Sequence, residues 1–79
     1  NRALATNNLG GILEALGDLA EAEKCYREAL ALRRKLNPAP EGDLDIVTTL
    51  GNLASVLSAR GEHAAAEKTA EEAHAMVLK

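Results

Sequence analysis

Aromatic side chains are almost missing from this chain: Tyr26 is the only one, and neither Trp nor Phe occurs. A β-sandwich or β-barrel needs many aromatic and β-branched positions, so the composition argues against both. One tyrosine is also too little to build a surface on which nucleic-acid bases stack. In their place the chain has sixteen alanines and thirteen leucines among 79 residues. Such small side chains favour closely packed helices, and we expect an all-α fold.

An excess of positive charge is missing as well. The chain has 9 basic and 12 acidic residues, a net charge of −3, and its only basic cluster is residues 33–35. Because nucleic-acid binding needs Lys and Arg concentrated on one face, we predict no nucleic-acid partner. The longest stretches without charge, residues 3–13 and 46–59, are shorter than the roughly 20 residues of a membrane-spanning helix. We therefore predict no membrane contact.

Cysteine is nearly absent, since Cys25 is the only one. A single cysteine excludes an intramolecular disulfide and a Cys-rich zinc module. A lone thiol fits a reducing compartment, so we expect a cytoplasmic location. No signal peptide is visible, and the chain begins at Asn1 rather than Met, which favours a fragment of a longer protein.

Motifs that carry chemistry are missing too. There is no P-loop, no G-x-S-x-G and no H-E-x-x-H, the patterns of common phosphate, nucleophile and zinc sites. His63 and His74 would lie about 16 Å apart along one helix, too far to share a metal ion. No neighbour of Cys25 in the sequence would stabilise a thiolate, so we expect a partly buried small side chain there. We predict no catalytic residue, no metal site and no cofactor, and hence no enzyme.

What the chain does have is an internal repeat. Residues 1–35 laid over residues 45–79, an offset of 44, show thirteen identities in thirty-five positions, where roughly three or four would arise by chance. Among the shared pairs are Asn8 and Asn52, and Gly17 and Gly61. Two copies of one structural unit are therefore expected.

Within each copy the apolar residues recur three to five positions apart, which predicts amphipathic helices. The apolar positions that open the two copies are Leu4, Leu9, Ile12, Leu13 and Leu16, then Leu50, Leu53, Val56 and Leu57. Gly17 and Gly61 then break the pattern, because glycine adopts the left-handed conformation that ends a helix. We expect helices at residues 2–16, 18–36, 44–60 and 62–79. They form repeat 1 (2–36) and repeat 2 (44–79) of one domain, joined by a loop at 37–43 that holds both prolines.

Charge is distributed unevenly between the two helices of each copy. The first helices carry only Arg2, Glu14, Asp45 and Arg60, whereas the second helices carry fifteen charges. A helix poor in charge is covered by neighbours, and a helix rich in Glu and Lys faces water. We expect the first helices to line an inner face of a stack and the second helices to form its outer face.

Small residues recur where the helices of a copy would meet. These are Gly10 and Ala54 on the first helices, with Ala22 and Ala66 on the second. Small side chains let two helix axes approach to about 8–10 Å. Tyr26 is then expected to fill the centre of the packing.

These residues also carry a family resemblance. The two copies read Thr6-x2-Leu9-Gly10-x2-Leu13 with Ala22-x3-Tyr26, and Leu50-x2-Leu53-Ala54-x2-Leu57 with Ala66-x3-Ala70. They resemble two tetratricopeptide repeats over nearly the full chain. The segment Asn7-Asn8-Leu9-Gly10, the Gly17-Asp18 turn and the long period look like the kinesin light chain subtype. The resemblance implies two stacked antiparallel helix-turn-helix repeats, a short right-handed α-solenoid segment of a longer array.

The resemblance also implies a function. Tetratricopeptide arrays hold a peptide or protein segment in a concave groove lined by the first helices. The groove positions map onto Asn7, Asn8, Gly11, Glu14, Thr48, Asn52, Ser55 and Ser58, with Leu4, Ala15, Gly51 and Ala59. The amides of Asn8 and Asn52 can each donate to and accept from a peptide backbone, or each can satisfy a group inside the array. Because no Lys or Arg occupies these positions, a clamped acidic chain terminus is disfavoured.

Two other functions remain open. The ends of a two-repeat stack expose apolar surface, and Met76, Val77 and Leu78 would normally meet a following repeat, so the chain could form homo-oligomers through its terminal helices. A regulatory segment of a larger signalling protein or enzyme is the remaining alternative.

Overall fold

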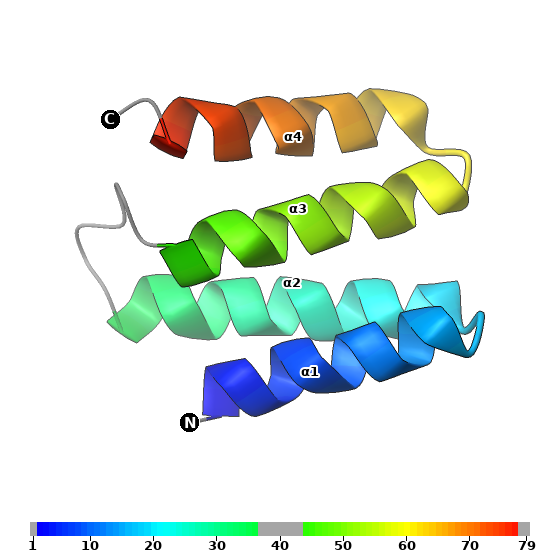
Figure 1. Cartoon of the computed structure of the whole chain (residues 1–79), viewed down its shortest axis with the longest axis horizontal. Helices are drawn as coiled ribbons and strands as arrows, with labels where there is room; N and C mark the ends of the chain where they lie inside the picture. Colours follow the sequence, from blue (N-terminus) through cyan, green and yellow to red (C-terminus); the bar gives the residue numbers. More distant parts are fainter. Residues whose placement is uncertain (1, 37–43, 78–79) are drawn as a thin grey trace.

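The computed structural model describes residues 2–36 and 44–77, and these form helices with no strand among them. The helices are α1 (Arg2–Ala15), α2 (Leu19–Leu36), α3 (Leu44–Ala59) and α4 (His63–Val77). They stack in chain order and alternate in direction (Figure 1). The predicted all-α fold is confirmed, and each expected helix is found within two residues of its expected bounds. The predicted loop at 37–43 and Leu78 lie outside the described residues.

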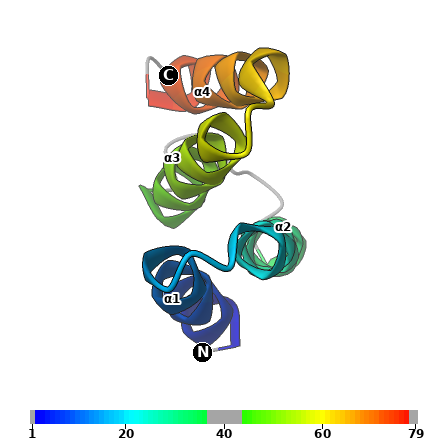
Figure 2. The same cartoon turned by 90° about the vertical axis from the view of Figure 1, so that its right-hand side faces the viewer.

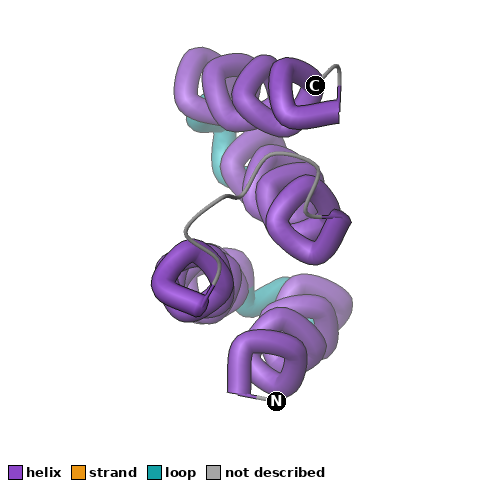
Figure 3. Tube along the Cα trace, turned by 90° about the vertical axis from the view of Figure 1, so that its left-hand side faces the viewer, coloured by secondary structure: helices purple, strands orange, loops and turns teal. Residues whose placement is uncertain are grey.

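The helices form two hairpins, α1 with α2 and α3 with α4, and α2 packs against α3 to join them. In the end-on views, α1 and α3 lie one above the other, and α2 is displaced to one side of them (Figures 2 and 3). The two first helices also contact each other directly. This offset places the exposed surfaces of α1 and α3 next to each other, as the uneven charge predicts.

Each hairpin turns at a glycine with positive φ. Gly17 has a φ of 85° and Gly61 a φ of 83°, a conformation that costs an L side chain energy. The amide of the residue after Gly17 donates to the Leu13 carbonyl at 2.9 Å, and the Gly17 amide donates to the Glu14 carbonyl at 3.0 Å. The same two bonds recur around Gly61. Both helices therefore end in a Schellman motif, the left-handed stop predicted from the glycines.

The core lies between α2, α3 and α4, with Tyr26 at its centre. The Tyr26 side chain is 1% exposed, and α3 contributes its whole apolar stripe. A Cβ atom added to Gly10 would lie 2.8 Å from Tyr26 Cε1, so the ring packs directly on the α1 backbone. Ala22 is fully buried in the same core. The predicted close approach of small residues around Tyr26 is confirmed.

The first helix differs from the expectation that its apolar stripe is covered. Only Leu13 of the stripe packs against the core. Leu9 and Ile12 are 49% and 59% exposed, although their counterparts in the second repeat, Leu53 and Val56, are buried. The reason is the position of each helix in the stack. In α3 the side that carries Leu53 and Val56 is covered by α2, whereas α1 is the first helix and no helix of the described chain covers its corresponding side.

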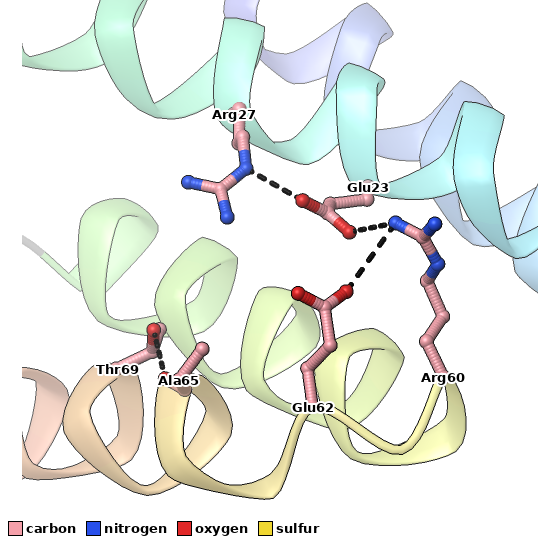
Figure 4. Close-up of polar contacts among 6 residues, drawn as sticks. All are labelled: Glu23, Arg27, Arg60, Glu62, Ala65 and Thr69. Atoms are coloured by element: carbon pink, nitrogen blue, oxygen red, sulfur yellow. Dashed lines mark hydrogen bonds and ion pairs between the residues drawn. The ribbon is translucent and has the colours of Figure 1, made fainter.

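Charged side chains close the junction between the hairpins. Among the residues that the structure describes, ion pairs between the hairpins include Glu23–Arg60, Arg33–Asp45 and Arg34–Glu72. Glu23 also accepts a hydrogen bond of 2.8 Å from Arg27, and Arg60 lies 3.5 Å from Glu62 (Figure 4). Because the core and these pairs join α2 to the second hairpin, the two hairpins form one packed unit.

Candidate functional site

All the predicted peptide-binding residues lie on α1 and α3, and each is at least partly exposed. Asn7, Glu14 and Asn52 are half-buried, whereas Asn8, Gly11, Thr48, Ser55 and Ser58 are exposed. Leu4, Ala15, Gly51 and Ala59 are exposed on the same two helices. Since α1 and α3 contact each other, we call the surface that these residues line on the two helices the inner face.

Asn7 and Asn52 meet where the two helices touch. Asn52 Nδ2 donates to Asn7 Oδ1 at 3.4 Å, and the Thr49 hydroxyl lies 3.3 Å from the same oxygen. The Thr49 hydroxyl also donates to the Asp45 carbonyl at 2.8 Å. Part of the hydrogen-bonding capacity of both asparagines is therefore used inside the stack, as the alternative interpretation of Asn52 predicts. Asn8, one position along, is exposed.

Glu14 holds three helices together at the other end of the inner face. Its Oε1 accepts a 2.9 Å hydrogen bond from the Tyr26 hydroxyl on α2, and its Oε2 accepts one of 3.1 Å from Ser55 on α3. Burial, followed by the hydrogen bond to Glu14, raises the pKa of Tyr26 to about 12. The phenol therefore stays protonated and donates at physiological pH. Glu14 and Ser55 thus position the inner face as well as lining it.

A pocket of about 260 Å³ lies between the N-terminal halves of α1 and α3 and the C-terminal half of α2. Its lining combines three predicted groove residues, Leu4, Asn7 and Thr48, with others that the sequence analysis did not single out. The latter are Ala3, Ala29, Arg33, Asp45 and Thr49.

An ion pair forms one wall of this pocket, with 2.6 Å between Arg33 Nη2 and Asp45 Oδ2. In the sequence, Arg33 is visible only as part of the basic cluster at residues 33–35. Opposite charges at the end of one expected helix and the start of the next were a signal that could have paired it with Asp45.

Other predicted site residues are not gathered into the pocket. Asn8, Gly11 and Ser58 lie on the inner face outside the pocket lining. The site is therefore an open surface with one hollow at its edge.

The structure also places the residues considered for chemistry. Cys25 is half-buried, as expected, and burial raises the pKa of its thiol, with smaller contributions from Glu28 and Glu21. Within residues 2–36 and 44–77, no group of three or more His, Cys, Asp or Glu side chains could hold a metal ion. None of the helices in the described part of the chain has the length and apolar character to cross a membrane.

Comparison with known protein families identifies the repeat. A family model described as tetratricopeptide repeat matches residues 1–79. Neither the curated proteins nor the solved structures give a match.

Proposed function

Because the chain belongs to the tetratricopeptide repeat family, a family of protein-interaction modules, we propose that it is a non-catalytic module that binds a peptide or protein segment across the inner face of α1 and α3. We further propose that residues 1–79 form a single domain, that this domain is part of a longer array, and that it is located in the cytoplasm. The kinesin light chain subtype stays a prediction.

The observation that carries the proposal is the character of the inner face. Along α1 and α3 the exposed side chains other than Arg2 and Asp45 are uncharged, and Asn8, Thr48 and Ser55 offer hydrogen bonds. Small residues let a ligand backbone approach closely, and amide and hydroxyl groups can both donate to and accept from it. The second helices, in contrast, carry most of the charge. An extended peptide is therefore better matched by the inner face than by the outer helices.

The test begins with peptides selected from a phage-displayed random library on the immobilised protein. Selected peptides are titrated into the isotope-labelled chain, and NMR shift changes are expected at the amides of Asn8, Thr48 and Ser55. Asn8→Ala should weaken binding, whereas Glu67→Ala, an exposed position on α4, should leave it unchanged. Shift changes confined to α2 and α4, or equal affinity of the two variants, would refute the proposal.

A second candidate function is self-assembly, favoured by the exposure of Leu9 and Ile12 at positions whose counterparts Leu53 and Val56 are buried. A helix packed on this end face would bury apolar surface worth about 25 cal/mol per Å². Sedimentation over a range of concentrations tests it, with Ile12→Glu as the disrupting variant. A monomer at every concentration would exclude this function.

A further inference from the structure

The pocket beside Asn7 has no ligand assigned by the proposed function. We propose that it receives one side chain of the bound peptide, and that this side chain ends in a carboxamide, as those of glutamine and asparagine do. The inference rests on the proposed function, because a peptide must lie on the inner face for its side chain to reach the pocket.

The size of the pocket favours a side chain over a separate small molecule. Small-molecule sites typically measure about 300–1,000 Å³, and this pocket measures about 260 Å³. Its space depends on two small residues, Ala3 and Ala29, which are 5% and 1% exposed. Together with Leu4 they give the pocket an apolar wall that suits the methylene stem of a guest side chain.

The charges in the pocket disfavour an ionised guest. Arg33 and Asp45 pair at 2.6 Å, so the wall that they form carries no net charge. A guest lysine would meet the Arg33 guanidinium, and a guest glutamate would meet the Asp45 carboxylate. Either ion would lose hydration on entering without gaining a net opposite charge.

The remaining polar groups favour a guest that both donates and accepts. Asn7, Thr48 and Thr49 line the pocket. The Thr48 hydroxyl can both donate and accept. Thr49 already donates its proton to the Asp45 carbonyl and can only accept, and Asn7, whose Oδ1 accepts from Asn52, offers its Nδ2 donors. A guest carboxamide offers N–H donors and a carbonyl acceptor within one planar group. Its carbonyl can accept from the Asn7 amide while its N–H groups donate to the Asp45 carboxylate. A leucine or methionine guest would fill the same space but leave these hydrogen bonds unmade.

The test uses peptides selected as above whose NMR contacts lie on α1 and α3. We expect a Gln or Asn at one position of each peptide, and calorimetric titration should show at least roughly tenfold weaker binding when Glu, Lys or Leu replaces it. Equal affinity for the Gln and Leu peptides would overturn the pocket proposal and leave the proposed function standing. Failure to select any peptide that binds the inner face would overturn both.

A variant of the pocket supplies the reciprocal test. Asn7→Leu is expected to abolish the preference for Gln over Leu in the peptide, because it removes the amide that would hydrogen-bond to the guest side chain. Glu28→Leu places the same side chain at an exposed position of α2 and should keep the preference. Thr48→Val removes only a hydroxyl from the exposed rim of the pocket and should reduce the preference for Gln over Leu about two- to fivefold. It replaces Asn7→Leu in the test if that variant does not fold. An unchanged preference in the folded pocket variant would refute the assignment.

Discussion

Replacing Gly10 by alanine tests the contact that sets how closely α1 approaches α2. The new Cβ atom would lie 2.8 Å from Cε1 and 2.9 Å from Cδ1 of Tyr26. Carbon atoms in favourable contact are about 3.5–4.0 Å apart, so the overlap is severe. The ring has little room to retreat, because it is 1% exposed and its hydroxyl donates to Glu14 at 2.9 Å.

Two effects of opposite sign decide the magnitude. Overpacking a core costs about 1–3 kcal/mol, whereas alanine in a helix interior is favoured over glycine by about 1 kcal/mol. We therefore expect Gly10→Ala to lower the free energy of unfolding by up to about 2 kcal/mol. The control is Gly51→Ala, an exposed glycine near the middle of α3, where an added Cβ meets nothing within 4 Å. That variant should be stabilised by about 1 kcal/mol.

Thermal unfolding followed by circular dichroism measures the difference between the two variants. Each kcal/mol shifts the Tm of a domain this small by about 4–8 °C, and the control should melt higher. Adding Tyr26→Leu to both variants should remove most of the difference, since the ring is what the Cβ strikes. Equal Tm values for Gly10→Ala and Gly51→Ala would show that the close contact does not limit the packing.

Four further predictions concern the core and its charges. Tyr26→Ala should cost about 3–5 kcal/mol in urea denaturation, and an unchanged midpoint would contradict the central role of the ring. In the same assay Ala22→Leu, at a fully buried position, should lower the free energy of unfolding by about 1–3 kcal/mol. An unchanged stability would show that the helices of the hairpin are not closely packed there. Because burial and Glu14 raise the pKa of Tyr26 from 10.0 to about 12, the stability linked to its protonated hydroxyl is complete below pH 10 and lost as pH rises through 12. Tyrosinate absorbance, which reports this residue alone, should therefore show half-titration well above pH 10, and a midpoint at pH 10 would contradict the burial. Burial opposes ionisation of Glu23, but hydrogen bonds from Arg27 and Arg60 outweigh it and lower its pKa below 4.5. Stability should thus fall as pH drops below 4.5, less so in Glu23→Gln, and identical pH profiles would refute the linkage.

Much of the fold could be predicted because its signals are local. The amides of Gly17 and Gly61 donate to carbonyls three positions earlier, and the amides of the residues that follow them donate to carbonyls five positions earlier. The helix ends are therefore visible in a short stretch of sequence. The repeat offset then predicted two hairpins of the same kind. The exposure of Leu9 and Ile12 could not be predicted from periodicity, because an apolar stripe reads the same whether or not another helix covers it.

The candidate site was predictable in outline only. Repeat resemblance indicated which residues of α1 and α3 share the inner face. It could not show that Asn7 bonds Asn52, or that Glu14 joins Tyr26 to Ser55, because those partners lie on different helices. The pocket likewise needs Ala29 and Arg33 of α2 beside Asp45 of α3. The spacing of residues within one helix does not predict contacts between two helices.

The sequence by itself determined the helices, their glycine stops, the repeat and the near absence of charge on the inner helices, because each follows from neighbours within a few positions. Only the tertiary structure decided which apolar stripe is buried, which polar groups are spent between helices and where a hollow remains. The physical reason is that burial and hydrogen bonding depend on what an adjacent helix presents. Leu53 is buried and Leu9 exposed, although the two occupy the same position of the repeat, because α3 has α2 beside it and α1 stands at the end of the stack.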